Sequence, residues 1–227
     1  MSFLNIDQLL HGSFAFEIRF STKMILLERG KLAEFSKELD GRFTMKDYSD
    51  TQIQYSGDKD AQARIELDKI IVGCGNCSAA SFADSVKKFV PLAVEKFGFN
   101  KPNRLGYRVT AISKRKSIQE ACNEYFSLTA LKKENVDNVG SLMGYKIGTT
   151  IRMSDNMVCN IVLSPAMRRN IVINPKASKQ TDEFGIMVDI DIFREQNLDG
   201  KEEVKDFIDK ATRNLQDKIY PMMETVR

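Results

Sequence analysis

The chain has 227 residues, of which 42% are hydrophobic, so it can bury a core without metals or disulfides. Its 34 basic and 31 acidic side chains leave a net charge of +3, which provides no global field for nucleic acid or an anionic membrane. No aliphatic run approaches the roughly 20 residues that cross a bilayer, and the N-terminus lacks the basic lead-in of a secretory signal. Four cysteines at irregular spacing fit reduced thiols. We therefore expect a cytoplasmic protein with no membrane contact and no cofactor.

A strand opens the predicted structure. Residues 14–20 alternate between apolar and polar side chains, which is the period of a strand with one buried face. An amphipathic helix at 32–39 follows, and then two strands, at 52–56 and 64–72, flank a turn-forming segment. We expect these two strands to form a hairpin.

A longer helix is predicted at 78–97. Its apolar side chains recur at helical spacing and Gly98 is placed to end it, while Pro91 should kink it. A strand at 104–109 and a shorter helix at 118–131 come next.

The second half of the chain predicts a meander closed by a helix. Turn signals separate its strands, and the helix at 201–220 carries a continuous apolar stripe that should lie across the sheet. The strands are expected at 145–153, 157–163, 171–173 and 184–193.

A helical phrase occurs twice in the chain. Residues 86–90 and 204–208 share a Val-Lys-x-Phe-aliphatic sequence, and each copy follows a strand-like run. This repeat indicates an internal duplication. We therefore predict an α+β fold of two related halves, 1–113 and 114–227, packed as one body. Its mainly antiparallel sheet should be covered on one face by amphipathic helices.

One strand motif resembles that of a known family. The run Arg104-Leu105-Gly106-Tyr107-Arg108 is similar to the Arg-aliphatic-Gly-x-Arg-aromatic-x-Asn strand of a sporadically distributed bacterial family of uncharacterised proteins. The similarity extends to the acidic strand around Asp189 and Asp191 and to the C-terminal helix, whereas residues 109–111 depart from the family pattern. The resemblance implies the fold and a bacterial origin, and its sporadic distribution hints at defence-linked genes. It carries over no activity and no functional residues.

Two cysteines form a candidate redox pair. Cys74 and Cys77 lie between a strand and a helix start, where a helix N-terminus can lower a thiol pKa. The alternative is a tight turn that contains two incidental thiols. A zinc site needs about four ligands, but Cys122 and Cys159 fit buried apolar positions and His11 is alone. We predict no metal site.

Asp189 and Asp191 are a candidate carboxylate pair. They project from one face of a strand and could share a divalent ion or act as acid and base. The alternative is that they form the solvated face of a strand whose aliphatic residues point inward. Alternation alone explains that pattern fully, and we favour this interpretation. We predict no catalytic residues.

Basic residues gather in two windows that contain no acidic residue, 96–119 and 156–181. If these windows meet in space, they could hold a phosphate backbone. The alternative is a solvated strand end and loop, because basic clusters are common on globular surfaces. The candidate nucleic-acid-binding residues are Arg104, Arg108, Lys114, Arg115, Lys116, Arg168 and Arg169.

Three classes of function follow from these features. The first is a non-enzymatic protein-interaction or assembly module, such as a subunit of a bacterial multi-protein, defence-linked system. It would bind a protein partner through an exposed patch or a free sheet edge. A second copy of the chain is an alternative partner, which would form a homo-oligomer. The alternative is a nucleic-acid-binding protein that uses the two basic windows. A thiol enzyme built on Cys74 and Cys77 is the third class.

Overall fold

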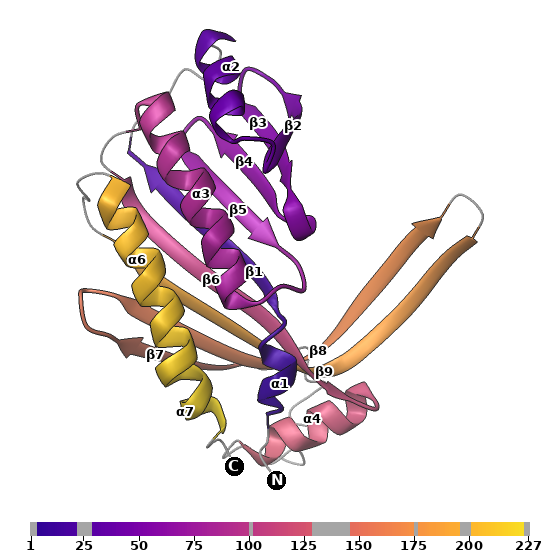
Figure 1. Ribbon diagram of the computed structural model, residues 1–227. Helices are drawn as coiled ribbons and strands as arrows, with labels where there is room; N and C mark the ends of the chain where they lie inside the picture. The colour runs from indigo at the N-terminus through magenta and orange to yellow at the C-terminus, as the bar shows by residue number, and fades with distance from the viewer. Residues whose placement is uncertain are drawn as a thin grey trace.

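The computed structural model of the chain forms one antiparallel sheet with helices packed against it (Figure 1). The structure describes residues 4–21, 29–99, 102–128, 146–174, 177–195 and 201–224. The strands are β1 (Ser13–Phe20), β2 (Phe43–Tyr48), β3 (Gln52–Gly57), β4 (Gln62–Glu66), β5 (Lys69–Cys74), β6 (Pro102–Arg115), β7 (Ile147–Arg152), β8 (Val158–Asn174) and β9 (Ala177–Arg194). They form a nine-stranded sheet in the order β2-β3-β4-β5-β1-β6-β9-β8-β7. The predicted α+β class with a mainly antiparallel sheet is confirmed.

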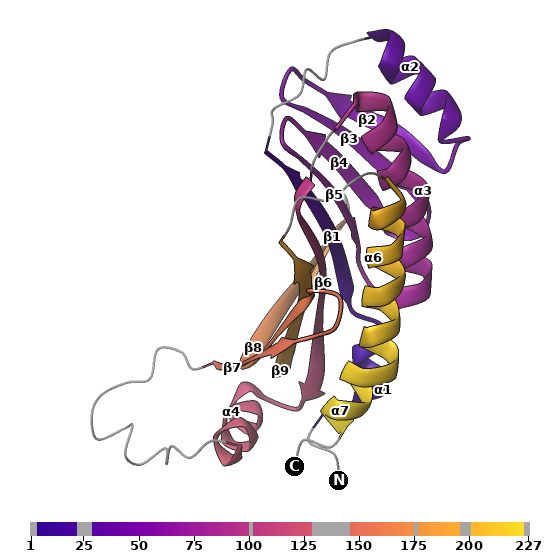
Figure 2. The same cartoon turned by 90° about the vertical axis from the view of Figure 1, so that its left-hand side faces the viewer.

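Two long helices lie side by side across one face of this sheet (Figure 2). They are α3 (Ala79–Phe97) and α6 (Lys201–Asn214), and a turn of π-helix at Leu215–Ile219 joins α6 to α7 (Tyr220–Glu224). Among the described residues, no helix is both long enough and apolar enough to cross a membrane. In the described parts of the chain, the other helices are α1 (Ile6–Leu9), α2 (Arg29–Glu38), α4 (Ile118–Ser127) and a 3₁₀ turn, Asp58–Asp60.

Helix α3 follows its sequence signals closely. The Ser78 hydroxyl caps the helix by accepting a hydrogen bond from the backbone N–H of Ser81, at 3.3 Å. Gly98 ends the helix with a φ of 66°, in the left-handed region that favours glycine. The helix continues through Pro91. The prediction of a helix that stops at Gly98 is therefore confirmed.

Aromatic side chains fill the core between α3 and the sheet. Phe89 on α3 is fully buried, and its ring centroid lies 4.8 Å from that of Phe43 and 5.3 Å from those of Phe35 and Tyr55. The alternating residues of β1 place their apolar members on this same face, where Phe16 is fully buried. Burial of these rings provides much of the driving force for packing the helices on the sheet.

Several predicted strands differ from the structure. The strand expected at 64–72 is divided into β4 and β5, because the chain turns between them at Leu67 and Asp68. The strands expected at 157–163 and 171–173 are one continuous strand, β8. The strand expected at 104–109 is longer, and β2 was not predicted.

The two halves of the chain have similar strand connections. If the chain is divided before β6 rather than at 113/114, the first strand of the first part, β1, pairs with its last strand, β5. In the second part the first strand, β6, likewise pairs with the last strand, β9. The pair β1–β6 joins the halves at the middle of the sheet. Strand β6 contains the predicted boundary at 113/114.

Two buried tyrosines allow a matched test of hydroxyl burial. The hydroxyl of Tyr107 lies toward the hydroxyl of Thr212. Within the described residues, neither the Tyr107 nor the Thr212 hydroxyl makes a hydrogen bond of normal geometry. The Tyr125 hydroxyl donates to the carbonyl oxygen of Leu163 at 2.9 Å. Both side chains are fully buried.

We expect Tyr107→Phe to leave the free energy of unfolding unchanged or to raise it, because removal of a buried, unbonded hydroxyl relieves a desolvation cost. Tyr125→Phe should lower it by about 1 kcal/mol, because it leaves a buried carbonyl without its donor. Urea denaturation of the two variants measures this difference. A larger loss for Tyr107→Phe than for Tyr125→Phe would contradict the prediction.

Candidate functional site

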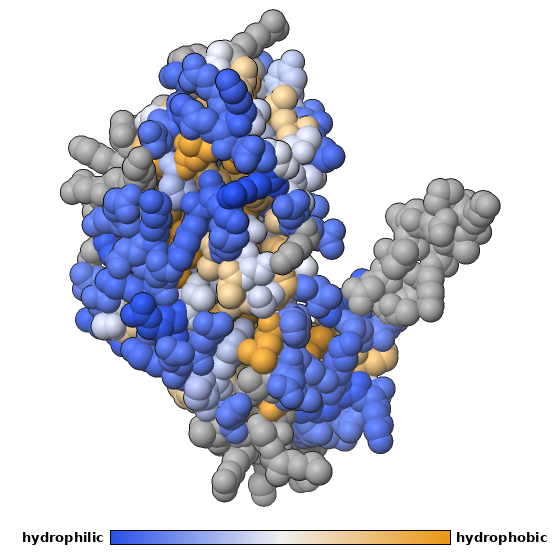
Figure 3. Space-filling model, in the orientation of Figure 1, coloured by the Kyte–Doolittle hydropathy of each residue, from blue (hydrophilic) through white to orange (hydrophobic). Residues whose placement is uncertain are grey.

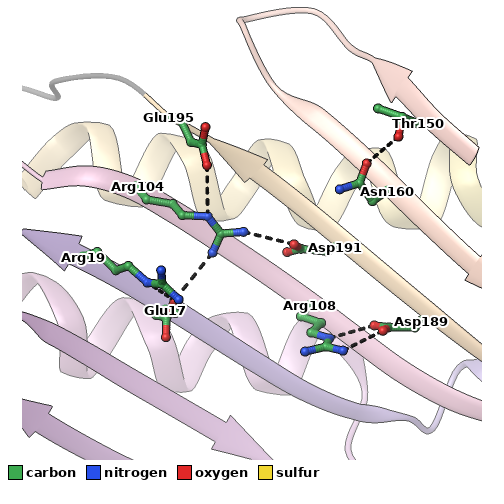
Figure 4. Close-up of polar contacts among 9 residues, drawn as sticks. All are labelled: Glu17, Arg19, Arg104, Arg108, Thr150, Asn160, Asp189, Asp191 and Glu195. Carbon is green, nitrogen blue, oxygen red and sulfur yellow. Dashed lines mark hydrogen bonds and ion pairs between the residues drawn. The ribbon is translucent and has the colours of Figure 1, made fainter. Parts of the chain in front are cut away.

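Charged side chains meet on the sheet face opposite α3 and α6 (Figure 4). We call this the polar face and define it by Glu17, Arg104, Arg108, Asp189 and Asp191. Strands β6 and β9 are neighbours there, and Arg108 lies directly opposite Asp191. The ion pairs run diagonally: Arg108 holds Asp189 through two hydrogen bonds of 2.7 and 2.6 Å, while Arg104 Nη2 lies 3.0 Å from Asp191 Oδ2.

Arg104 is the centre of this network. Its guanidinium lies 3.5 Å from Glu17, 3.6 Å from Glu195 and 5.0 Å above the ring centroid of Phe193. Only 21% of its side chain is exposed. A planar guanidinium that contacts carboxylates from β1 and β9 links strands on both sides of β6. Arg104 therefore has a structural role in the centre of the sheet.

The two aspartates, Asp189 and Asp191, each have an arginine partner. Burial raises the pKa of the Asp191 carboxyl, and the Arg104 guanidinium opposes that effect. The hydrogen bond to Asp189 raises the pKa of Arg108. Within the described part of the chain, no cluster of three or more potential ligands could hold a metal ion. Asp189 and Asp191 are thus engaged as ion-pair partners of Arg108 and Arg104.

The two basic windows converge at one carboxylate. Lys114 Nζ, from the first window, lies 2.6 Å from Glu183 Oε1, and Arg168 Nη2, from the second, lies 2.5 Å from Glu183 Oε2. Arg169 lies beside them and contacts Asp182 at 3.2 Å. The windows therefore meet, but acidic side chains of β9 partly neutralise them at the meeting point.

Other residues of the windows lie elsewhere. Arg115 is only 12% exposed and contacts Glu124 at 2.5 Å, which fixes α4 to the end of β6. Lys116 is exposed next to it. Lys96 pairs with Glu38 of α2 at 2.5 Å. Lys101 and Lys176 lie outside the described residues.

The candidate redox pair is buried. Cys74 and Cys77 are 8% and 7% exposed, and the Cys77 thiol donates to the carbonyl oxygen of Cys74 at 3.8 Å. Burial, together with the neighbouring Cys74, raises the pKa of Cys77 to about 12. A reactive thiol requires the opposite shift, since the thiolate is the nucleophile. The pair therefore resembles buried apolar side chains in a turn.

We expect both thiols to react slowly in the native protein. With iodoacetamide at about pH 8, Cys74 and Cys77 should be alkylated roughly a hundredfold more slowly than in the denatured chain. Intact-protein and peptide mass spectrometry would follow each site, with the less buried Cys122 as an internal comparison. Rapid labelling of either Cys74 or Cys77 would contradict this prediction and support the thiol-enzyme hypothesis.

A two-stranded ribbon projects from the sheet (Figure 1). Pairing of β8 with β7 ends at Leu163, and pairing of β9 with β6 ends at Phe184, yet β8 and β9 stay paired to Asn174 and Ala177. We call residues 168–174 and 177–183 the arm. Within the described residues, the backbone of the arm pairs only with itself.

A proline and a glycine lie where the arm leaves the sheet. Pro165, which has no N–H to donate, lies two residues after Leu163, where β8 has become an edge strand. On β9, Gly185 lies opposite Ala166 and packs directly against the backbone of Ser113. A side chain there would separate β9 from β6. These residues fix the position at which the arm leaves the sheet.

Two hollows lie at this base. One has a volume of about 700 Å³ and carries both signs of charge. The other has a volume of about 410 Å³ and is mainly apolar, with Met167 and Met187 in its lining. Figure 3 shows apolar surface where the arm leaves the body. The polar lining of the first includes His11, Asp60, Asn76, Lys114, Arg168 and Glu183.

Sequence reasoning found some of these residues and missed others. It identified Arg168, Arg169 and Lys114, which the fold brings to the base of the arm. It missed Glu183, Met167 and Met187. The available signal was the strand run 171–173 followed by the turn at Asn174, which together predict a hairpin end.

Comparison with known proteins assigns no family. A scan against models of protein families and a search of curated protein sequences found no match to this chain. The similarity of residues 104–108 to a bacterial strand motif remains a prediction. Function is therefore inferred from the geometry of the arm and its base.

Proposed function

We propose that the protein is a non-enzymatic protein-interaction or assembly module that docks a partner through the arm. The observation that supports this is the continuation of β8 and β9 beyond their last residues paired to β7 and β6. Both outer edges of the arm are free of strand partners within the described residues. Free edges present N–H and C=O groups that a partner's strand can pair with.

The sequence of the arm supports the same proposal. A two-stranded ribbon alone is marginally stable in water, because it can bury little apolar surface. Nevertheless, residues 171–173 are three successive branched aliphatic residues, Ile-Val-Ile. A partner strand that pairs with the edges of the arm would add backbone hydrogen bonds, so docking would stabilise the arm.

The connections of the two halves support an internal duplication as part of this proposal. In each of the two parts that result from a division before β6, the first strand pairs with the last, and a helix that shares the Val-Lys-x-Phe phrase follows that last strand. The duplicated unit would provide the sheet, and the arm would be an elaboration of the second copy. The bacterial, defence-linked assembly that the strand motif suggests is the setting we propose for it.

Shortening the arm tests the proposal. Residues 169–182 are replaced with Asn-Gly, which closes a two-residue hairpin between Arg168 and Glu183, residues that lie directly opposite each other. We expect the shortened chain to lose its protein partner in affinity purification from the native host at high salt. Its melting temperature should stay within a few degrees of the parent, since the arm pairs only with itself in the described residues. Equal recovery of the same partner with both chains would refute the proposal.

Nucleic-acid binding is the second candidate, and the convergence of Lys114 and Arg168 at Glu183 favours it. Lys114→Glu/Lys116→Glu is the suitable variant, because Arg115 holds α4 and its replacement would disturb the fold. This candidate predicts RNA or DNA in the purified material that salt releases and that the double variant loses. Nucleic acid that persists in the double variant would count against it.

A further inference from the structure

The apolar hollow at the base of the arm has the form of an anchor pocket. Its volume of about 410 Å³ can take a bulky side chain. Met167, in its lining, is 51% exposed, although methionine is commonly buried. Methionine side chains adapt their shape to an incoming apolar group. An exposed methionine in a concave apolar surface is therefore suited to receive a partner's side chain.

Both charged residues in the described lining of this hollow are basic, although each also contacts an acidic side chain of β9. The charged residues in its described lining are Arg168 and Arg169, whose side chains are 47% and 51% exposed. In the described residues Arg169 contacts Asp182 through Nε, so the N–H groups of its two terminal nitrogens can donate to a further carboxylate. Exposed arginines at the rim of an apolar pocket match a ligand that carries both an apolar group and a carboxylate.

From this combination we infer that the hollow binds an acidic segment of the protein partner, with one bulky apolar side chain inserted as the anchor. The carboxylates of that segment bind Arg168 and Arg169. The inference rests on the proposed function and identifies the chemistry of the partner. Large apolar anchors in pockets provide much of the energy of protein interfaces, and arginine is frequent around them.

The neighbouring polar hollow extends the binding surface. It shares Ser13, Ala111, Ile112 and Arg168 with the apolar one, so the two hollows adjoin along the same stretch of β6. Its mixed charges suit the polar backbone of a peptide that continues past the anchor. A basic segment would meet the two arginines and be repelled.

Selection from a phage-displayed library of short random peptides on the full chain tests the inference. We expect enriched peptides in which an aromatic or large aliphatic residue lies next to Asp or Glu. A synthetic, fluorescein-labelled peptide from this set should bind Met167→Glu roughly tenfold more weakly, as measured by fluorescence anisotropy. Met45→Glu is the matched control, because Met45 is 39% exposed on β2, away from the hollow, and should bind as the parent does.

A charge exchange tests the rim. Arg169→Glu should weaken binding of the acidic peptide, and replacement of the peptide's acidic residue with Lys should restore binding to that variant. No enrichment, enrichment of basic peptides, or equal binding to Met167→Glu would overturn the inference. If one of these outcomes is found but the chain with the shortened arm still fails to capture the partner, the proposed function stands and only the inferred anchor pocket is rejected.

Discussion

Gly185→Ala is expected to lower the free energy of unfolding by about 2–3 kcal/mol. A Cβ at this position would lie 2.9 Å from the carbonyl carbon of Ser113 and nearer still to its oxygen. Backbone of a central strand cannot move as a flexible side chain can, so β9 must separate from β6. Urea denaturation measures the loss, and the same shift would change the direction in which the arm leaves the sheet.

Gly148→Ala is the control for this substitution. Gly148 is exposed on β7, and no atom lies within 4 Å of a Cβ built there. We expect a change within about 0.5 kcal/mol, because strand residues tolerate alanine where space is available. Equal stability of Gly185→Ala and the parent would show that β6 and β9 are not held at this contact.

Phe89→Ala should be more destabilising, with an expected loss of about 3–5 kcal/mol. The fully buried ring joins α3 to α2 and the outer strands through Phe35, Phe43 and Tyr55. Its removal leaves a cavity among side chains that belong to separate elements. The loss is measured from the midpoints of denaturant unfolding, provided that the dependence of the unfolding free energy on denaturant concentration is the same for both proteins.

Phe89→Leu provides the comparison for this site. Leucine retains much of the apolar volume, so the loss should be less than half of that for alanine. A loss below about 1 kcal/mol for Phe89→Ala would mean that the aromatic cluster does not hold α3 on the sheet.

The sequence predicted the elements that have strong local signals. Helix α3 was correct at both ends because Ser78 and Gly98 are specific terminators whose effect does not depend on tertiary contacts. Strand β1 was correct because one of its faces is buried along its whole length. Both signals lie within a few residues of the element that they predict.

Elements with weak patterns were missed. In β2 only Phe43 is buried, so the strand shows no alternation, and its place at the edge of the sheet explains why. Pro165 and the pair Arg168 and Arg169 interrupt the apolar pattern in the middle of β8, so the sequence predicts two separate strands there. The pairing of β8 with β9 runs through these residues.

The candidate site was only partly predictable for the same reason. The arginines of β6 and the aspartates of β9 were both noticed, but Arg108 and Asp189 are 81 residues apart and meet only through the strand register. Glu183 lies just outside the second acid-free window, so the neutralising partner of Lys114 and Arg168 was not foreseen. Register between distant strands has no local signature.

Site-specific photo-crosslinking in the native host tests the role of the arm most directly. Benzoylphenylalanine would replace Val172 in the arm and, as a control, the exposed Gln216 on the helical side. We predict that irradiation links one protein to position 172 and not to position 216, and that mass spectrometry places the link on an acidic segment of that protein. Absence of any protein crosslink at 172, or the same crosslinked protein at both positions, would contradict docking through the arm.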